Sequence, residues 1–312
     1  MRPKHQRLLY VAAWSVLLSL LASCATAVTC GHPRAGGKKA PPFLWEIAGP
    51  TPSYLFGTMH VSDPRVSTLA PSVKCALTQS QVVYLETRGS DIVPRDLMRA
   101  TLRKDKRAMM TILGRELYEK VKAYFARYKL PPRAFESLKV WMLTVQLSLF
   151  DYAKYRRGLV MDQMIENHAL ATGKRVRSLE TPLVGFQLLD TLTVAEQVSL
   201  LRLSLNQLAR ARKTGRNLAE QMIVHYARGD AKRLVELLNL DKADVHPVMK
   251  KFVDLLLTRR NLYWLKTILP ALRAKPSRTS FFAVGAGHTL GSQGLVALLR
   301  ARGFKVRRLG YR

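Results

Sequence analysis

The chain has 312 residues, 48% of them hydrophobic, so it is long enough to bury a full core, and we expect one domain. Its 51 lysines and arginines against 21 acidic residues give a formal net charge of +30, which attracts anionic lipid, acidic polymers or nucleic acid. The basic residues are scattered, with no zinc finger and no aromatic-interleaved RNA-binding pattern, which argues against specific nucleic-acid recognition.

The first residues have the pattern of an export signal. Three basic residues precede an apolar run, residues 8–22, that is short for a transmembrane span. Leu21-Ala22-Ser23-Cys24 resembles a bacterial lipobox, so we expect residues 1–23 to be removed, with lipid on Cys24 as a membrane anchor in the periplasm or on the outer membrane. Ordinary cleavage after Ala25-Thr26-Ala27, giving a soluble exported protein, is the alternative.

A flexible tether is expected over residues 24–42, which are rich in glycine, lysine and proline. The globular domain then covers residues 43–312. With Cys24 lipidated, Cys30 and Cys75 could form a disulfide in an oxidising compartment, and two unpaired thiols are the alternative.

Hydrophobic periodicity divides the domain into strands and helices. The expected strands cover residues 43–47, 53–57, 81–85, 175–179, 281–284 and 304–309, the last at a sheet edge. The expected helices cover residues 69–79, 97–171 with a break at Pro131-Pro132, 183–272 and 290–302. The pattern predicts an α/β (α+β) fold: a central mixed sheet with helices on its faces and a large helical insertion, about 97–272.

Four polar residues each follow the carboxyl end of an expected strand: His60, Glu86, Glu180 and His288. Open α/β sheets bind ligands at the carboxyl ends of their strands. We therefore expect these side chains to meet at one edge of the sheet.

Both histidines end a G-x-x-H turn, Gly57-Thr58-Met59-His60 and Gly285-Ala286-Gly287-His288. Glycine allows a ligand or a metal to approach the backbone closely, so Gly57, Thr58, Gly285 and Gly287 are candidate binding residues. A helix beginning near Leu290 would add its N-terminal amides, which favour an oxyanion or a carboxylate.

Two imidazoles and a carboxylate suit manganese, cobalt or zinc with a position left open for water. His60, Glu86 and His288 are the expected ligands. The remaining histidines of the domain are expected to be structural or surface residues: His168, His225 and His246.

The chain resembles the TraB/GumN family, relatives of the Tiki metalloproteases. The resemblance rests on Phe43-Leu44-Trp45 with residues 54–61 at the start, and on residues 283–288 with Gly303-Phe304-Lys305-Val306 at the end. It covers residues 42–312 and implies a fold distantly similar to erythromycin esterase and ChaN-like proteins. For Tiki relatives it implies metal-dependent peptide cleavage.

Further positions match family motifs. Glu86 matches the family glutamate, Leu179-Glu180-Thr181 is similar to a central motif, and Arg260-Asn261 is similar to an Arg-Asn pair. Two positions depart from the pattern: Val160-Met161-Asp162 stands where Gly-x-Asp is usual, which weakens Asp162 as a candidate, and Gly185 stands where glutamine is usual.

The leading hypothesis is a metal-dependent, peptidase-like hydrolase of the bacterial envelope that acts on a peptide or a small envelope ligand. Glu180 or Asp162 would complete the shell or act as general base, and Arg260 would bind a substrate carboxylate or an oxyanion. One alternative is an envelope lipoprotein that binds a metal, haem or acidic ligand without turnover. Another is an adhesive basic surface with a vestigial pocket. The sequence does not set the oligomeric state.

Overall fold

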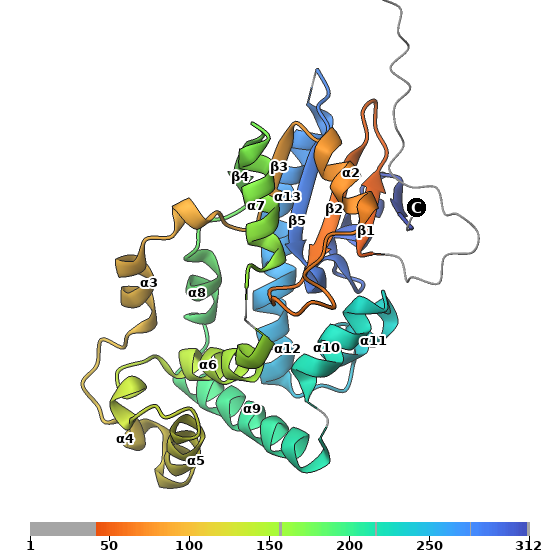
Figure 1. Ribbon diagram of the computed structural model, residues 1–312. Helices are drawn as coiled ribbons and strands as arrows, with labels where there is room; N and C mark the ends of the chain where they lie inside the picture. The colour runs from red at the N-terminus through yellow and green to blue at the C-terminus, as the bar shows by residue number, and fades with distance from the viewer. Residues whose placement is uncertain (1–41, 156–157, 216, 275, 311–312) are drawn as a thin grey trace, which may run out of the picture. The chain divides into compact units, whose positions relative to one another are not determined.

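A six-stranded mixed sheet lies at the centre of the fold, in the order β4-β3-β5-β2-β1-β6 (Figure 1). The computed structural model describes residues 42–155, 158–215, 217–274 and 276–310, all within one compact unit, Gly31–Arg312. The expected signal segment, Cys24 and most of the tether lie outside the described residues.

The strands match the expected ones closely. Their bounds are β1 Leu44–Ile47, β2 Ser53–Thr58, β3 Val82–Leu85, β4 Arg175–Ser178, β5 Ser280–Gly285 and β6 Val306–Arg308. Neighbours among β4, β3, β5 and β2 are parallel, whereas β1 is antiparallel to both β2 and β6. The expected hairpin, the edge position of the last strand and the mixed α/β architecture are therefore confirmed.

Burial explains the placement of the strands. Every residue of β5 is buried, as expected of a central parallel strand covered on both faces. In β4 the arginines Arg175 and Arg177 are exposed, which suits an edge strand. In register, Thr58 pairs with Gly285, and Leu85 pairs with both Ala283 and Ser178, so these strands end at the same edge of the sheet.

Helices cover the sheet and form the rest of the domain. Their bounds are α2 Pro71–Gln79, α3 Pro94–Thr101, α4 Met109–Leu113, α5 Arg115–Ala126, α6 Val140–Tyr152, α7 Met161–Ala171, α8 Val184–Leu189, α9 Val194–Thr214, α10 Leu218–Ala227, α11 Ala231–Leu238, α12 Pro247–Val253, α13 Arg259–Arg273 and α14 Leu295–Arg300. Helix α7 packs against β3, β4 and β5, and α13 lies on the opposite face of the sheet (Figure 1). Part of the expected helical insertion, about 97–272, thus belongs to the layers around the sheet.

The other helices of this region have a core of their own. Helices α4, α5, α6 and α9 bury a cluster that includes Phe125, Phe135 and Leu143. A second cluster around Trp141 joins α6 to α8 and α12. No helix among the described residues is both long enough and apolar enough to cross a bilayer.

The helix expected over 290–302 is shorter than predicted. Residues Ala286–Thr289 form a 3₁₀ turn, and α14 begins only at Leu295. Gly291 has a φ of +75°, and a Cβ atom on Gly294 would lie 2.2 Å from the carbonyl oxygen of Leu290, so the chain turns tightly before the helix starts. The expected helix N-terminus beside His288 is therefore wrong.

Cys75 lies in α2 and is disulfide-bonded, with its partner cysteine outside the described residues. It is therefore not one of two free thiols. The proposed pairing with Cys30 stays a prediction.

Candidate active site

The sheet brings the predicted polar residues together at the carboxyl ends of four adjacent strands. His60 follows β2, Glu86 follows β3, and Glu180 follows β4. His288 lies in the 3₁₀ turn after β5. The strand ends converge as the sequence predicts.

His60 is oriented by Asp162, which lies in the first turn of α7. Nδ1 of His60 lies 2.7 Å from Oδ2 of Asp162, and the hydroxyl of Thr58 donates to the other carboxylate oxygen at 2.9 Å. Because the carboxylate can only accept, the ring holds a hydrogen on Nδ1. Its Nε2 atom then faces Oε1 of Glu86 at 3.9 Å.

His288 is oriented by an amide. The side-chain nitrogen of Asn261 donates to the carbonyl oxygens of His288 and Gln293, at 3.2 and 2.9 Å. This leaves Oδ1 of Asn261 facing Nδ1 of His288 at 2.8 Å as an acceptor, so this ring also holds a hydrogen on Nδ1. Its Nε2 atom lies 3.8 Å from Oε1 of Glu86.

Glu86 is therefore the point on which both rings converge. Its Oε1 atom also accepts a hydrogen bond from the backbone N–H of Gly285 at 2.7 Å. A Cβ atom on Gly285 would lie 3.1 Å from Nε2 of His60 and 3.3 Å from Oε1 of Glu86. Glycine at this position thus keeps a small space clear among the polar groups.

Arg260, from α13, closes the other side of the site. Its Nη2 atom donates to Oε2 of Glu86 at 2.5 Å and lies 2.6 Å from Oε1 of Glu180, to which Nε also donates at 2.8 Å. Its Nη1 atom donates to the carbonyl of Leu256 and to Nε2 of His288, each at 3.2 Å. All the N–H groups of Arg260 face partners in the protein. To bind substrate, as predicted, Arg260 would have to break one of these hydrogen bonds.

Glu180 is more deeply buried than Glu86, with a side chain 3% exposed. Its Oε2 atom accepts from the indole N–H of Trp264 at 2.8 Å, while Oε1 accepts from Arg260. The Trp264 ring also lies 4.3 Å from the His288 ring, centroid to centroid. In this arrangement Glu180 holds Arg260 in place and has no oxygen directed at the two histidines.

Burial and charge separate the two histidines. Asp162 raises the pKa of the half-exposed His60 to about 9, with Glu86 adding to the effect. Burial lowers the pKa of His288 to about 3. At neutral pH, His60 carries a positive charge and His288 is neutral.

The pKa values of Glu86 and Glu180 are also shifted in opposite directions. Burial alone would raise the pKa of Glu86, but His288, Arg260 and His60 together bring it down to about 2. For Glu180, burial outweighs its bonds to Arg260 and Trp264, and its pKa is raised. The surroundings therefore favour the charged form more strongly for Glu86 than for Glu180.

The comparisons with known proteins identify the family of the chain. The TraB/PrgY/gumN family model matches residues 43–308. The chain belongs to this family. The resemblance found in the motifs is thereby confirmed, and no solved structure matches the chain significantly.

Relatives of this TraB/PrgY/GumN protein are named metalloproteases. "Metalloprotease TIKI1" of Danio rerio is 27% identical over 85% of this chain and 62% of its own length. "Metalloprotease TIKI homolog" of Amphimedon queenslandica is 26% identical over 94% of this chain and 66% of its own length, and "Metalloprotease TIKI2" of Danio rerio is 26% identical over 85% and 60%. The chain thus spans less than two thirds of the length of these relatives.

The donor types of this TraB/PrgY/GumN site fit a divalent ion, although its ligands lie further apart than in a closed shell. Nε2 of His60 and Oε1 of Glu86 border the space kept clear by Gly285, whereas His288 faces this space with Cδ2 and its Nε2 atom accepts from Arg260. The 3.8 and 3.9 Å separations exceed the ligand spacing around a tetrahedral zinc ion, about 3.3 Å. Accordingly, no group of three or more His, Cys, Asp and Glu side chains in the described ranges is already close enough to hold an ion. His60, Glu86 and His288 would have to draw together around it.

The other candidate binding residues have different surroundings. A Cβ atom on Gly57 would lie 3.0 Å from Cα of Ala286 and 3.1 Å from Cβ of Phe43, so this glycine allows β2 to pack closely. A Cβ atom on Gly287 would contact Leu238 and Leu257. Neither position faces the polar groups, so their predicted role in binding a cofactor has no support from these contacts.

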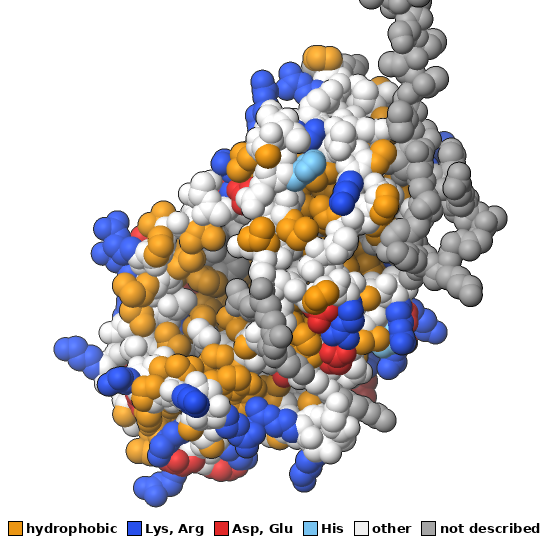
Figure 2. All heavy atoms as spheres, in the orientation of Figure 1, with side chains coloured by type: hydrophobic (Ala, Val, Ile, Leu, Met, Phe, Trp, Pro, Cys, Tyr) orange, Lys and Arg blue, Asp and Glu red, His pale blue; other side chains and the backbone are white. Residues whose placement is uncertain are grey.

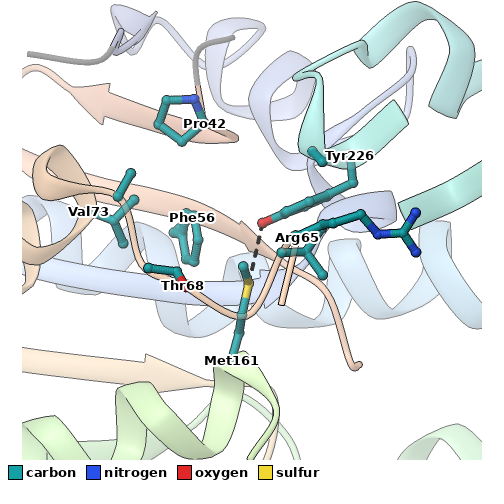
Figure 3. A pocket seen from close by; sticks show the side chains of 10 residues that line it. Pro42, Phe56, Arg65, Thr68, Val73, Met161 and Tyr226 are labelled. Atoms are coloured by element: carbon teal, nitrogen blue, oxygen red, sulfur yellow. Dashed lines mark hydrogen bonds between the residues drawn. The ribbon is translucent and has the colours of Figure 1, made fainter. Parts of the chain in front are cut away.

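A small cavity of about 50 Å³ lies beside β2. Figure 3 shows Phe56, Arg65, Met161 and Tyr226 around it. The Tyr226 hydroxyl lies 3.4 Å from the Met161 sulfur and donates to the carbonyl of Gly57 at 2.5 Å. The residues that line this cavity include none of the predicted site residues.

Three residues that contact the predicted site residues received too little weight in the sequence analysis. Asp162 and Asn261 orient the two histidines, and Trp264 binds Glu180. Asp162 and Asn261 lie in motifs noted in the sequence, Val160-Met161-Asp162 and Arg260-Asn261. Trp264 follows Arg260 by one helical turn, which is the only local signal for it.

Proposed function

We propose that this protein is a metal-dependent, peptidase-like hydrolase of the bacterial cell envelope. The observation that carries the proposal is the convergence of two imidazole nitrogens, from His60 and His288, on one carboxylate oxygen of Glu86. The naming of its relatives as metalloproteases supports the same reaction class.

His60, Glu86 and His288 would hold the ion, for which manganese, cobalt and zinc are the candidates. Bound there, the ion would polarise a substrate carbonyl and lower the pKa of a water molecule. Asp162 and Asn261 direct the Nε2 atoms of the two rings toward Glu86.

Arg260 holds Glu86 in its charged form and fixes its orientation through Oε2. Because Glu180 keeps Arg260 in place and has both oxygens engaged, we assign it a positioning role instead of that of general base. Gly285 leaves room beside the Glu86 oxygen for a reacting group.

The test begins with metal content. The purified full chain, loaded with manganese, cobalt or zinc and dialysed, should hold about one ion per molecule by elemental analysis. A variant with both His60→Ala and His288→Ala should lose it, whereas His225→Ala, in a histidine bonded to Asp230 outside the site, should keep it. Equal metal content in wild type and the double variant contradicts the proposal.

Turnover separates a hydrolase from a binding protein. A peptide library incubated with the loaded protein should yield cleaved products by mass spectrometry, and the double histidine variant should yield none above background. Stable retention of the ion with no cleaved peptide would favour the binding-protein alternative.

The envelope location is part of the proposal and rests on the lipobox-like sequence at Cys24. In a bacterial host, Cys24→Ala should shift the protein from the membrane fraction to the soluble exported fraction. Labelled palmitate should be incorporated by wild type and not by the variant. A soluble wild-type protein would favour ordinary signal cleavage.

The face seen in Figure 2 does not single out a separate function for the basic residues. Figure 2 shows lysine and arginine side chains distributed over one face, with hydrophobic side chains between them. Such a distribution gives long-range attraction to anionic surfaces without a specific binding patch.

A further inference from the structure

Asp162 has each of its carboxylate oxygens committed to the strand end that carries the first G-x-x-H turn. Oδ2 lies 2.7 Å from Nδ1 of His60, and Oδ1 accepts from the Thr58 hydroxyl at 2.9 Å. The two partners come from the same turn, whereas Asp162 comes from α7, 102 residues later. The contact therefore ties α7 to the end of β2.

The His60 side chain needs such a contact. It is 58% exposed, whereas the side chain of His288 is 5% exposed and packed against Trp264. A ring with little packing around it can adopt several rotamers, and a charge-assisted hydrogen bond restricts them. Thr58, which binds the second oxygen, prevents the carboxylate from rotating away.

The contact also decides which nitrogen is free to bind. A carboxylate offers only acceptors, so the nitrogen facing Asp162 keeps its hydrogen, and the lone pair of the neutral ring belongs to Nε2. Nε2 is the atom that faces Glu86 and the space beside Gly285. In the neutral ring, the opposite tautomer would place a hydrogen on Nε2, in this space.

We propose that Asp162, held by Thr58, is a positioning residue that fixes the His60 ring and keeps its Nε2 atom toward Oε1 of Glu86 and the space beside Gly285. This role rests on the proposed function, because it prepares His60 as a ligand. It also explains why the second residue of the Gly57-Thr58-Met59-His60 turn carries a hydroxyl.

The first test determines the tautomer of His60 in the absence of metal. Long-range ¹H–¹⁵N spectra of the metal-free chain, recorded in buffer alkaline enough for neutral imidazole, should show His60 as a single Nδ1–H tautomer. Asp162→Ala should give averaged ¹⁵N shifts typical of mixed tautomers. Thr58→Val removes only the supporting hydroxyl, so it should change the same ¹⁵N shifts by a smaller amount than Asp162→Ala. It replaces Asp162→Ala as the test variant if that protein does not fold.

The second test reads zinc affinity by calorimetry. Asp162→Ala should weaken binding about 10- to 100-fold, as loss of an orienting carboxylate does at other metal sites. The matched control is Asp230→Ala, because Asp230 also binds a histidine Nδ1, that of His225, at 3.1 Å and outside the site. The control should leave both the His60 spectrum and the zinc affinity unchanged.

The outcomes separate the two proposals. An unchanged His60 tautomer in both Asp162→Ala and Thr58→Val overturns the positioning role. If the tautomer changes as expected but the wild-type chain takes up no zinc, manganese or cobalt, the positioning role is supported and the metal-dependent function fails.

Discussion

Nη2 of Arg260 lies 2.5 Å from Oε2 of Glu86, and each of the two side chains is only 14% exposed. The same guanidinium also pairs with Glu180, so one cation balances two buried carboxylates. Removing one partner of a buried ion pair costs more than the pair contributes, because the remaining charge stays buried without compensation. The stability of the fold and the charge state of the site are therefore linked through Arg260.

Arg260→Lys should test this link. Lysine keeps the positive charge, but its ammonium group cannot reach both carboxylates and His288 with the fixed fork geometry of arginine. We expect the free energy of unfolding to fall by about 3 kcal/mol in urea titrations. The neighbouring Arg259→Lys is the control, because Arg259 is exposed and pairs with Asp254 at the surface, so its effect should stay within about 0.5 kcal/mol. Equal effects of the two substitutions would contradict the link.

Gly285→Ala should lower metal affinity with little effect on folding stability. Its backbone φ of −52° is accessible to alanine, but the new methyl group would lie 3.1 Å from Nε2 of His60 and 3.3 Å from Oε1 of Glu86. We expect metal affinity to fall at least tenfold, or about 1.4 kcal/mol, by calorimetry. Gly185→Ala, in α8, where an added Cβ atom would meet nothing within 4 Å, should retain full affinity and gain some stability. Full affinity in Gly285→Ala would show that this space is not used.

The two histidines should have opposite effects on how the free energy of unfolding changes with pH. The pKa of His288 is lowered to about 3, so the unfolded chain binds the extra proton below about 6.5, and stability should fall as the pH drops from 6.5. The pKa of His60 is raised to about 9, so its contribution is complete below 6.5 and is lost as the pH rises through 9. The urea midpoint should be measured between pH 5 and 9. Its dependence on pH should become weaker on the acid side in His288→Gln and on the alkaline side in His60→Gln. Unchanged slopes in both variants would contradict the assignment.

Local sequence was sufficient to predict the strand ends and the residues that follow them. His60, Glu86, Glu180 and His288 each follow a short apolar run, and parallel strands bring such ends to one edge of a sheet. The helix after His288 was predicted to begin near Leu290, but the tight turn at Gly291 delays its start to Leu295.

The partners of these residues could not be predicted in the same way, because they come from distant parts of the chain. Asp162 reaches His60 across 102 residues, and Arg260 reaches Glu86 across 174. No periodicity specifies which helix face will meet a given strand end. The predicted role of Arg260 in substrate binding followed from its charge and from the family-like Arg260-Asn261 pair. Only the packing of α13 shows that Glu86 and Glu180 already occupy its donors.

Trp264→Phe should show how strongly Glu180 depends on its indole partner. The substitution keeps an aromatic ring beside His288 but removes the N–H that binds Oε2 of Glu180 at 2.8 Å. Because that carboxylate is 3% exposed, the lost bond should lower the free energy of unfolding by about 2 kcal/mol, measured by urea denaturation. Trp141→Phe removes a similar bond, 2.7 Å long, to Asp190, whose side chain is 40% exposed and can bind water instead. We expect a cost of about 1 kcal/mol there, so equal costs would mean that burial of the acceptor does not set the strength of these bonds.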